Sequence, residues 1–240
     1  IAAASKVAHP RIRAELLGVL ASRNATEALD VILEALRDAD EAVRVAALGA
    51  LGQLGGDDVL ERALESLVSS HSPRERAAAE KAVGTICARS PDKPRCARVT
   101  LAALEKAPPA ARGPVLRQLG RLGGPKALEA VRAAAKDSNV TIQDAAVRAL
   151  ADWPDASVAD DLFEIARSSP RETHRVLALR AYVRVVSLAS DRPAERTLQM
   201  LQDAMAVARR PEDKKFVLAA LAGVPHRRAL EIAESALDDA

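Results

Sequence analysis

Aromatic side chains are scarce in this sequence: Phe, Trp and Tyr together make up 2% of its 240 residues. Its core therefore cannot consist mainly of large rings. The apolar residues are chiefly Ala, Leu and Val, which suit helix-on-helix packing better than a β-sandwich. No run approaches the roughly 18 apolar residues of a membrane-spanning helix. We expect an all-α protein that does not enter a membrane.

An excess of one charge is also absent, because 35 Lys and Arg residues stand against 33 Asp and Glu residues, a net charge of +2. This balance argues against nucleic acid as a partner, since nucleic-acid binding would then need a local basic patch.

Cysteine is limited to Cys87 and Cys96, which flank the segment ARSPDKPR. No second Cys pair or His pair lies near them, so the sequence does not support a zinc site. Two interpretations stay open. The side chains are two small buried thiols, or they form a disulfide that closes this short loop in an oxidising compartment.

A repeat runs through the chain. Each copy starts near a Pro, Asp or Asn, carries a basic or amide side chain, and continues with apolar residues at helical spacing, as in DEAVRVAALGAL. We take Arg44 as the reference position of the repeat. Its equivalents, 31 to 39 residues apart, are Arg13, Arg76, Arg112, Gln143, Arg175 and Lys214.

The positions downstream of the reference predict a core, because those four, seven and ten residues on fall on one helical face. Only Glu80, four residues after Arg76, breaks this pattern badly. Trp153 and Tyr182 fall on the same face, so we expect both to pack in the core rather than to bind a ligand. The seventh position is apolar throughout: Leu20, Leu51, Val83, Leu119, Leu150, Tyr182 and Leu221.

A second set of amphipathic segments lies between these copies, for example TEALDVILEALRD and DDVLERALESLVSS. Gly55-Gly56 and Gly123-Gly124 have the positions of helix-ending glycines. Two helices in each repeat of this length are typical of an α-solenoid. We predict a right-handed α-solenoid of about seven antiparallel helix pairs that forms one domain over residues 1–240.

The segment RDADEAVRVAALGALGQLGG resembles a HEAT repeat of the bacterial, Ala/Leu-rich type related to PBS-lyase HEAT repeats. KDSNVTIQDAAVRALADWP is a second good match, and the likeness covers essentially the whole chain. It is weakest at residues 72–106 and 190–210. The residues that carry it in the first segment are Asp40, Val43-Arg44, Ala46-Ala47, Leu51 and Gly55-Gly56.

Phrases such as LGRLGGPKALEAVRAAAKD also resemble HEAT modules inside large, often exported, proteins of GC-rich bacteria. This second likeness slightly favours an exported setting over a cytoplasmic one. The first residues contain no initiator Met and break at His9-Pro10, so they do not resemble a signal peptide. We therefore expect a fragment of a longer, multidomain protein.

In the HEAT pattern an acidic residue of one unit and a basic residue of the next form a ladder. Asp40 and Arg44 match those places, with Asp38 as an alternative acid. Arg44 lies at the edge of the apolar face, where its planar fork can bind a carboxylate or helix-end carbonyls. Recurrence at seven places favours this structural role. The acid column is patchier, because Asn139 and Arg171 replace Asp40 in later units.

No catalytic constellation is visible in the sequence. The dispersed histidines lack the spacing of a metal site, so we expect capping and surface roles for His9, His71, His174 and His226. No GxSxG-type nucleophile motif occurs, and LGQLGG is a helix end rather than a phosphate-binding loop. We therefore expect no catalytic residue, no cofactor and no metal.

Basic side chains recur five residues after the reference, nearly opposite the apolar face. We predict that they form a stripe on the concave face, where they hold an acidic partner; the competing interpretation is a solvated surface. The column begins with Gly18 and Gly49. The predicted partner-binding residues are Lys81, Arg117, Arg148 and Arg180, together with Arg121 and Arg184 four residues further on.

We expect a non-enzymatic scaffold, a monomeric module that binds a protein or a neighbouring domain of its own chain through this face. The alternative is a HEAT-like enzyme, chromophore lyase-like or nucleic-acid-processing, although the low aromatic content argues against base chemistry. A pocket that joins Arg148 or Arg180 to a perturbed carboxylate, such as Asp144 or Asp152, would favour the enzyme. A third interpretation is a structural spacer without a ligand.

Overall fold

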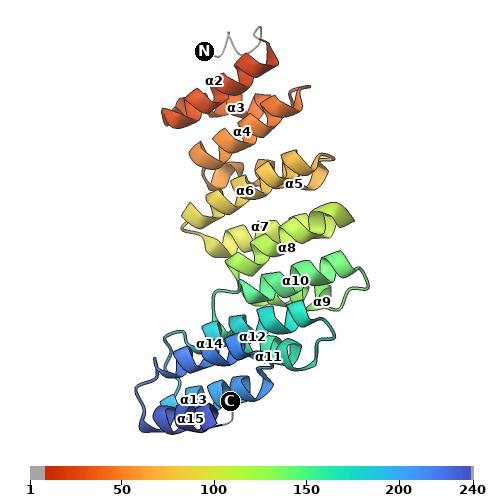
Figure 1. Ribbon diagram of the computed structural model, residues 1–240. Helices are drawn as coiled ribbons and strands as arrows, with labels where there is room; N and C mark the ends of the chain where they lie inside the picture. Colours follow the sequence, from red (N-terminus) through yellow and green to blue (C-terminus); the bar gives the residue numbers. More distant parts are fainter. Residues whose placement is uncertain (1–8, 239–240) are drawn as a thin grey trace. The chain divides into compact units, whose positions relative to one another are not determined.

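Helices form the regular structure of residues 9–238, the part of the chain that the computed structural model describes, and no strand occurs in this range. The α-helices run from α2 to α15 and are joined by short turns (Figure 1). The predicted all-α architecture of repeated helices is confirmed. The backbone divides into two compact units, residues 1–145 and 146–240, so the single domain stays a prediction.

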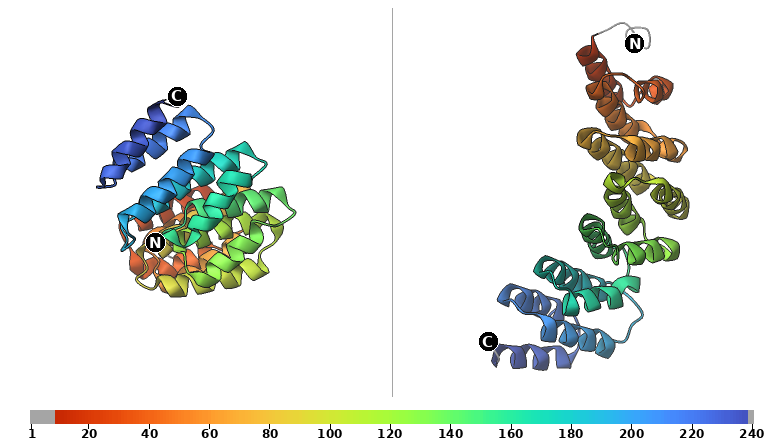
Figure 2. Two further views of the ribbon diagram at one scale, coloured as in Figure 1. Left: turned by 90° about the horizontal axis from the view of Figure 1, so that it is seen from below. Right: turned by 90° about the vertical axis from the view of Figure 1, so that its right-hand side faces the viewer.

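Unit 1 consists of two layers of helices, seen end on in the right view of Figure 2. Consecutive helices of the even layer pack on one another, and α3, α5 and α7 each pack mainly on the even helix that follows. The even layer contains α2 (Pro10–Ser22), α4 (Glu41–Leu54), α6 (Pro73–Arg89) and α8 (Pro109–Leu122). The odd layer contains α3 (Leu29–Ala35), α5 (Leu60–Ser69), α7 (Lys93–Lys106) and α9 (Pro125–Ala134), with 3₁₀ turns η1 (Thr26–Ala28) and η2 (Asp57–Val59) before α3 and α5.

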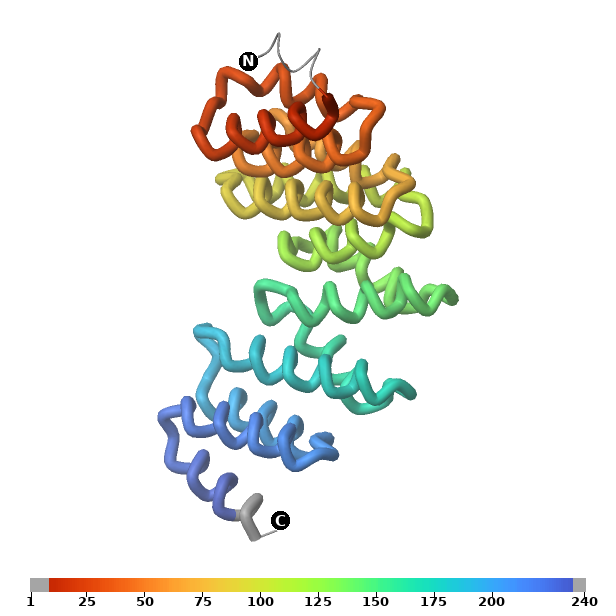
Figure 3. The backbone as a smooth tube through the Cα atoms, turned by 45° about the horizontal axis from the view of Figure 1, so that its top comes forward, coloured from red at the N-terminus to blue at the C-terminus, as the bar shows by residue number. Residues whose placement is uncertain are grey.

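Unit 2 also consists of helices packed on one another, and the boundary between the units falls within α10 (Val140–Ala151). α11 packs on α12, and α13 contacts both α12 and α14. Figure 3 follows the backbone through these helices. The remaining elements are η3 (Ala156–Val158), α11 (Ala159–Ser168), α12 (Glu172–Val186), α13 (Ala194–Val207), α14 (Pro211–Leu221) and α15 (Arg227–Asp238).

The apolar columns predicted from the repeat form the core. Every residue of the seventh-position column is buried, from Leu20 to Leu221. Trp153 is fully buried, and the ring of Tyr182 packs against that of Phe163 at 5.2 Å between centroids. The core role predicted for Trp153 and Tyr182 is confirmed.

Small residues set the spacing between neighbouring even helices. A Cβ atom added to Gly52 of α4 would lie 2.8 Å from the Cα atom of Ala82 in α6. Glycine is therefore required at this position for the close approach of two backbones, and not for an unusual backbone angle. At the end of α8 the reason is conformational, because Gly123 and Gly124 have φ values of 73° and 97°.

The column four residues before the reference begins the even helices. The Asp40 carboxylate accepts hydrogen bonds from the backbone N–H groups of Ala42 (2.8 Å) and Val43 (3.4 Å). The Asn139 side chain accepts an equivalent bond from Thr141 at 2.9 Å. The expectation that Asp40 is the acid of the ladder is therefore wrong. This column supplies N-caps, a role in which Asn replaces Asp readily.

The reference column binds backbone carbonyls at the end of the preceding odd helix. Arg44 Nη1 donates to the carbonyl oxygens of Asp38 (2.9 Å) and Ala39 (3.0 Å). These contacts satisfy carbonyls of the turn after the odd helix, so the predicted structural role is confirmed for Arg44 and for the four residues with equivalent bonds. The equivalent bonds are Arg76 to Ser70 (2.7 Å), Arg112 to Ala107 (3.3 Å), Gln143 to Ala135 (3.3 Å) and Arg175 to Ser169 (2.8 Å).

The first two arginines of the column also bind carboxylates. Arg13 forms a two-pronged pair with Asp38, with N–O distances of 2.9 and 2.8 Å. The hydrogen bond from Arg13 lowers the pKa of the Asp38 carboxyl below its ordinary value. Arg44 donates from Nε and Nη2 to Glu75 Oε2 of the next even helix, at 3.1 and 2.9 Å. The ladder acids are therefore Asp38, the predicted alternative, and Glu75.

Candidate interaction surface

The exposed face of the even layer in unit 1 carries three of the predicted partner-binding residues. Lys81 lies on α6, and Arg117 and Arg121 lie on the neighbouring helix α8. Lys81 and Arg121 are exposed, and neither side chain has a hydrogen bond or ion pair with any residue in the described part of the chain. We call these three residues the cationic patch.

Arg117 is held in place by Glu80, the residue that broke the apolar pattern. Arg117 Nε and Nη2 donate to the two Glu80 carboxylate oxygens, both at 2.7 Å. The pair joins α8 to α6, which explains a carboxylate in an otherwise apolar column. The sequence held one signal for this contact: Glu80 directly precedes the basic column to which Arg117 of the next repeat belongs.

Arg121 lies against the backbone of α6. A Cβ atom added to Gly84 would come within 3.6 Å of Arg121 Nη1 and 3.1 Å of the Gln118 side-chain oxygen. The absence of a side chain at Gly84 therefore leaves room for the Arg121 head close to α6. Arg121 lies near Gly84 and Arg117 binds Glu80, and both of these partners are on α6. The cationic patch therefore spans two adjacent helices of one unit.

The other three predicted residues belong to unit 2. Arg148 is exposed on α10. Arg180 pairs with the buried Asp213 at 3.3 Å, and the pKa of Asp213 is lowered, first by Arg210 and then by Arg180. Arg184 Nη2 donates to the carbonyl oxygens of Ala151 (2.9 Å) and Trp153 (2.6 Å) at the end of α10. Arg184 therefore binds the carbonyls at the C-terminal end of α10, and Arg180 forms an ion pair with a buried acid.

The six residues predicted to form one continuous stripe include two kinds of cation. Lys81 and Arg121 are exposed and have no partner among the described residues, whereas the heads of Arg117, Arg180 and Arg184 bind other parts of the protein. Because the six residues are divided between two separately described units, the continuity of the stripe stays a prediction. The patch in unit 1 is the part whose geometry is defined.

The glycines that precede Lys81 in its column leave the same face bare. Gly18 and Gly49 are exposed, and a Cβ atom at either would meet nothing within 4 Å. Neither packing nor a positive φ requires glycine at these sites. At this position of the repeat, the face therefore changes from no side chain on α2 and α4 to a cation on α6 and α8.

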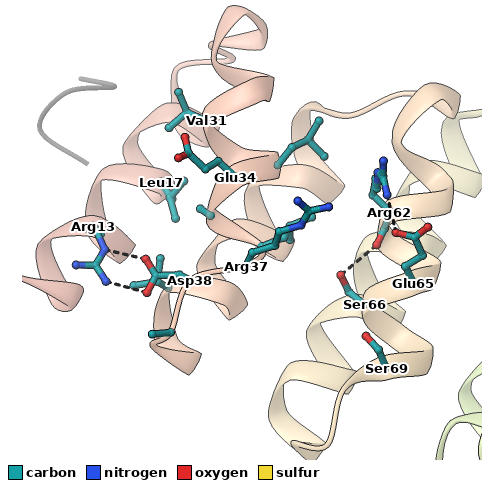
Figure 4. A pocket seen from close by; sticks show the side chains of 15 residues that line it. Arg13, Leu17, Val31, Glu34, Arg37, Asp38, Arg62, Glu65, Ser66 and Ser69 are labelled. Carbon is teal, nitrogen blue, oxygen red and sulfur yellow. Dashed lines mark hydrogen bonds and ion pairs between the residues drawn. The ribbon is translucent and has the colours of Figure 1, made fainter. Parts of the chain in front are cut away.

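A cavity of about 860 Å³ lies in unit 1, on the side of the short helix α3. Figure 4 shows Arg37 and Arg62 reaching into it from opposite sides, above Ser66 and Ser69. Its charged lining is balanced, because Arg13, Arg37 and Arg62 are matched by Glu34, Asp38 and Glu65. Two of these cations are already paired, Arg13 with Asp38 and Arg62 with Glu65. The lining therefore favours neither an anionic nor a cationic ligand.

The titratable groups with lowered pKa values have structural partners. Asp38 and Asp213 face arginines that keep their carboxylates ionised, which suits an ion pair better than a general acid. Within residues 9–238 no three His, Cys, Asp or Glu side chains gather as they would around a metal ion. In the same range, no helix combines the length and apolar character needed to cross a bilayer.

The histidines partly follow their predicted roles. His9 accepts a hydrogen bond from the Arg11 backbone N–H (3.4 Å), and His226 accepts one from Arg228 (3.2 Å), so both cap helix starts. His71 is exposed, as expected. His174 is buried in α12, where neither a cap nor a surface role was possible, so this part of the expectation is wrong.

Comparisons with known proteins agree with this geometry. A family model for HEAT repeats matches residues 1–84 and 97–182, which is more than half of the chain. A solved structure of an archaeal HEAT-like repeats protein from Thermococcus onnurineus NA1 is similar, with a TM-score of 0.51 and 17% identity. The alignment covers 95% of this chain and 98% of that one, and at this identity the likeness concerns the fold alone. No curated protein matches the chain.

Proposed function

The chain belongs to the HEAT-repeat family, and from this premise we propose that it is a non-enzymatic interaction scaffold. The scaffold binds a protein partner, or another domain of its own chain, through the exposed face of the even layer in unit 1. HEAT-type solenoids suit this role because stacked helices present an extended surface without requiring a single deep pocket.

The observation that carries the proposal is the cationic patch. Lys81 and Arg121 have no partner among the described residues, although acids are as common as bases in the chain. Arg117, on the same helix as Arg121, is oriented by Glu80, the sequence neighbour of Lys81. Exposed, unpaired cations beside one fixed guanidinium favour an acidic partner surface, which they would attract and orient.

The site geometry supports binding rather than chemistry. An enzyme would need a pocket that joins a cation to a carboxylate with an altered pKa, such as Arg180 with Asp152. The cavity in unit 1 does join cations to Asp38, but the hydrogen bond from Arg13 lowers the pKa of that carboxyl and holds it in an ion pair, as Arg210 does for Asp213. No observation favours the lyase-like or nucleic-acid-processing alternative.

The test is a charge reversal on the patch, Lys81→Glu combined with Arg121→Glu. The probe is a fluorescent poly-glutamate peptide, whose binding is followed by anisotropy at low and at physiological salt. We expect the double variant to bind at least about tenfold more weakly, because two favourable charge contacts become repulsive. Circular dichroism would show unchanged helicity, since both side chains are exposed.

The matched control reverses two exposed cations of the odd layer, Arg98→Glu on α7 with Lys126→Glu on α9. It alters net charge equally and should retain most of the binding. Equal weakening by the control and patch variants would show that only net charge matters, and the proposed site would then be wrong. So would undetectable binding of the peptide to the wild type at low salt.

A further inference from the structure

The only two cysteines of the chain lie against each other. Cys87 is in the last turn of α6 and Cys96 in the first turn of α7, and both are free thiols in the structure. They are buried in the same core cluster of unit 1, with 3% and 0% of their surfaces exposed, and the nearby Cys96 contributes to raising the pKa of Cys87. Two cysteines in one core cluster, on either side of the corner between α6 and α7, favour a pair over two unrelated small core residues.

The corner between α6 and α7 is fixed by contacts that do not involve the thiols. Ser90 Oγ donates to Asp57 Oδ2 at 2.8 Å, and Arg95 Nη1 donates to the Asp57 carbonyl oxygen at 2.9 Å. Lys93 Nζ donates to the Cys87 carbonyl oxygen at 2.5 Å. The fold therefore holds the two cysteine side chains together before any covalent bond joins them.

We propose that Cys87 and Cys96 are a disulfide site that fastens α6 to α7 when the chain folds in contact with a disulfide oxidant. One cysteine thiolate attacks the oxidant's disulfide, forms a mixed disulfide and releases one thiol. The second thiolate then attacks the cysteine sulfur of the mixed disulfide and releases the other thiol. Two protein thiols are oxidised to one disulfide, and one oxidant disulfide is reduced to two thiols.

Burial determines when this reaction takes place. Desolvation, with a further contribution from the Cys96 thiol, raises the pKa of Cys87 to about 12. The thiolate that attacks a disulfide is therefore scarce in the folded protein, and the reaction is fast only while the corner is open. The bond forms during folding, and the same burial then shields it from reductants.

The disulfide would join two neighbouring repeats. α6 packs on α5 and α7 packs on α8, whereas direct packing between α6 and α7 is slight. A covalent bond at this corner closes a short loop and so restricts the unfolded chain at the junction. It also ties α6, which carries Lys81, to the repeat that contains α8, although the proposal stands whether or not the cationic patch binds a partner.

The experiment uses the full chain, unfolded and refolded in parallel in reduced and in oxidised glutathione buffers. Remaining thiols are alkylated under denaturing conditions, and the products are analysed by mass spectrometry. We expect the oxidised sample to lack alkylation and to yield a crosslinked peptide pair containing Cys87 and Cys96. Its thermal midpoint should rise by about 5–10 °C, as expected for a short loop in a chain of this size.

The single variant Cys96→Ala is the control, and its midpoint should be the same in both buffers. Two alkylated thiols in the oxidised wild type would overturn the proposal. A crosslinked product with a lower thermal midpoint than the reduced protein would also overturn it, because the bond would then strain the corner. Both decisive readings come from the wild-type chain and do not depend on folding of the variant.

Discussion

Arg44 and Gly49 lie five residues apart on α4, one at the contact with neighbouring helices and the other on the exposed face. Arg44 donates to two carbonyls of the preceding turn and to Glu75 of the next even helix. Gly49 has open space around it. The contact region of α4 is therefore determined by its neighbours, whereas Gly49 on the exposed face meets nothing within the described chain.

The same residue types have different roles in the two regions. Gly52 is required where α4 meets α6, but Gly49 is not required by the fold. Arg44 is satisfied inside the protein, but Arg121 has no internal partner. A substitution in the contact region should lower the free energy of unfolding more than the same type of substitution on the exposed face. The predictions below test this difference.

The largest effect should come from Arg44→Ala. The variant loses two carbonyl contacts and leaves the Glu75 carboxylate, with only 11% of its side chain exposed, without its cation. We expect a loss of about 2–4 kcal/mol in the free energy of unfolding, measured by urea denaturation. The control, Lys81→Ala on the exposed face, should change stability by no more than about 0.5 kcal/mol. Similar losses for both would contradict the comparison.

A smaller loss is expected for Gly52→Ala. The added methyl group would lie 2.8 Å from the Ala82 Cα atom, so α4 and α6 must move apart. Overpacking of this kind typically costs about 1–3 kcal/mol. A thermal midpoint equal to that of the wild type would show that the helix spacing is not set by this glycine.

The Gly49→Ala variant, the matched change on the exposed face, should be more stable than the wild type. The methyl group meets nothing within 4 Å, and alanine is the better helix former. We expect a gain of about 0.5–1 kcal/mol in the free energy of unfolding. A destabilised Gly49→Ala variant would mean that the exposed face has internal contacts that the structure does not show.

The smallest expected effect is the pH dependence of the stability that the Arg13–Asp38 pair contributes. The folded state lowers the Asp38 pKa, so the pair stabilises the fold above the unfolded value of about 4, and this contribution is lost as the pH falls through the folded value. Arg13→Gln should therefore be less stable than the wild type at pH 7, with a difference that shrinks below about pH 4. Urea denaturation from pH 3 to pH 7 measures it, and a constant difference would contradict the assignment.

The sequence allowed the helices, the core columns and the carbonyl-binding role of the reference arginines to be predicted. These features depend on periodicity within a single helix, which is a local property. The partners Glu75 and Glu80 were not identified, because each contact joins helices more than 30 residues apart. For the same reason the role of Asp40 was misassigned: its spacing from Arg44 fits a ladder and an N-cap equally well.

The predicted stripe shows that a column of equivalent positions predicts exposure but not internal ion pairs. The sequence placed Lys81, Arg121 and Arg180 on equivalent faces, and their exposure agrees with that placement. It could not tell which of these cations the protein itself neutralises. Arg180 meets Asp213, whereas Lys81 and Arg121 meet no described partner. Partner binding by the remaining cations stays a prediction.

By itself the sequence determined the all-α repeat, its register and the buried face of each helix, because the 3.6-residue period and the capping residues act within one helix. The tertiary structure decided which arginines are satisfied, which glycines are required and whether Cys87 meets Cys96. These outcomes depend on distances of a few ångströms between separate helices, and such distances follow from the packing of whole side chains rather than from any pattern along one of them.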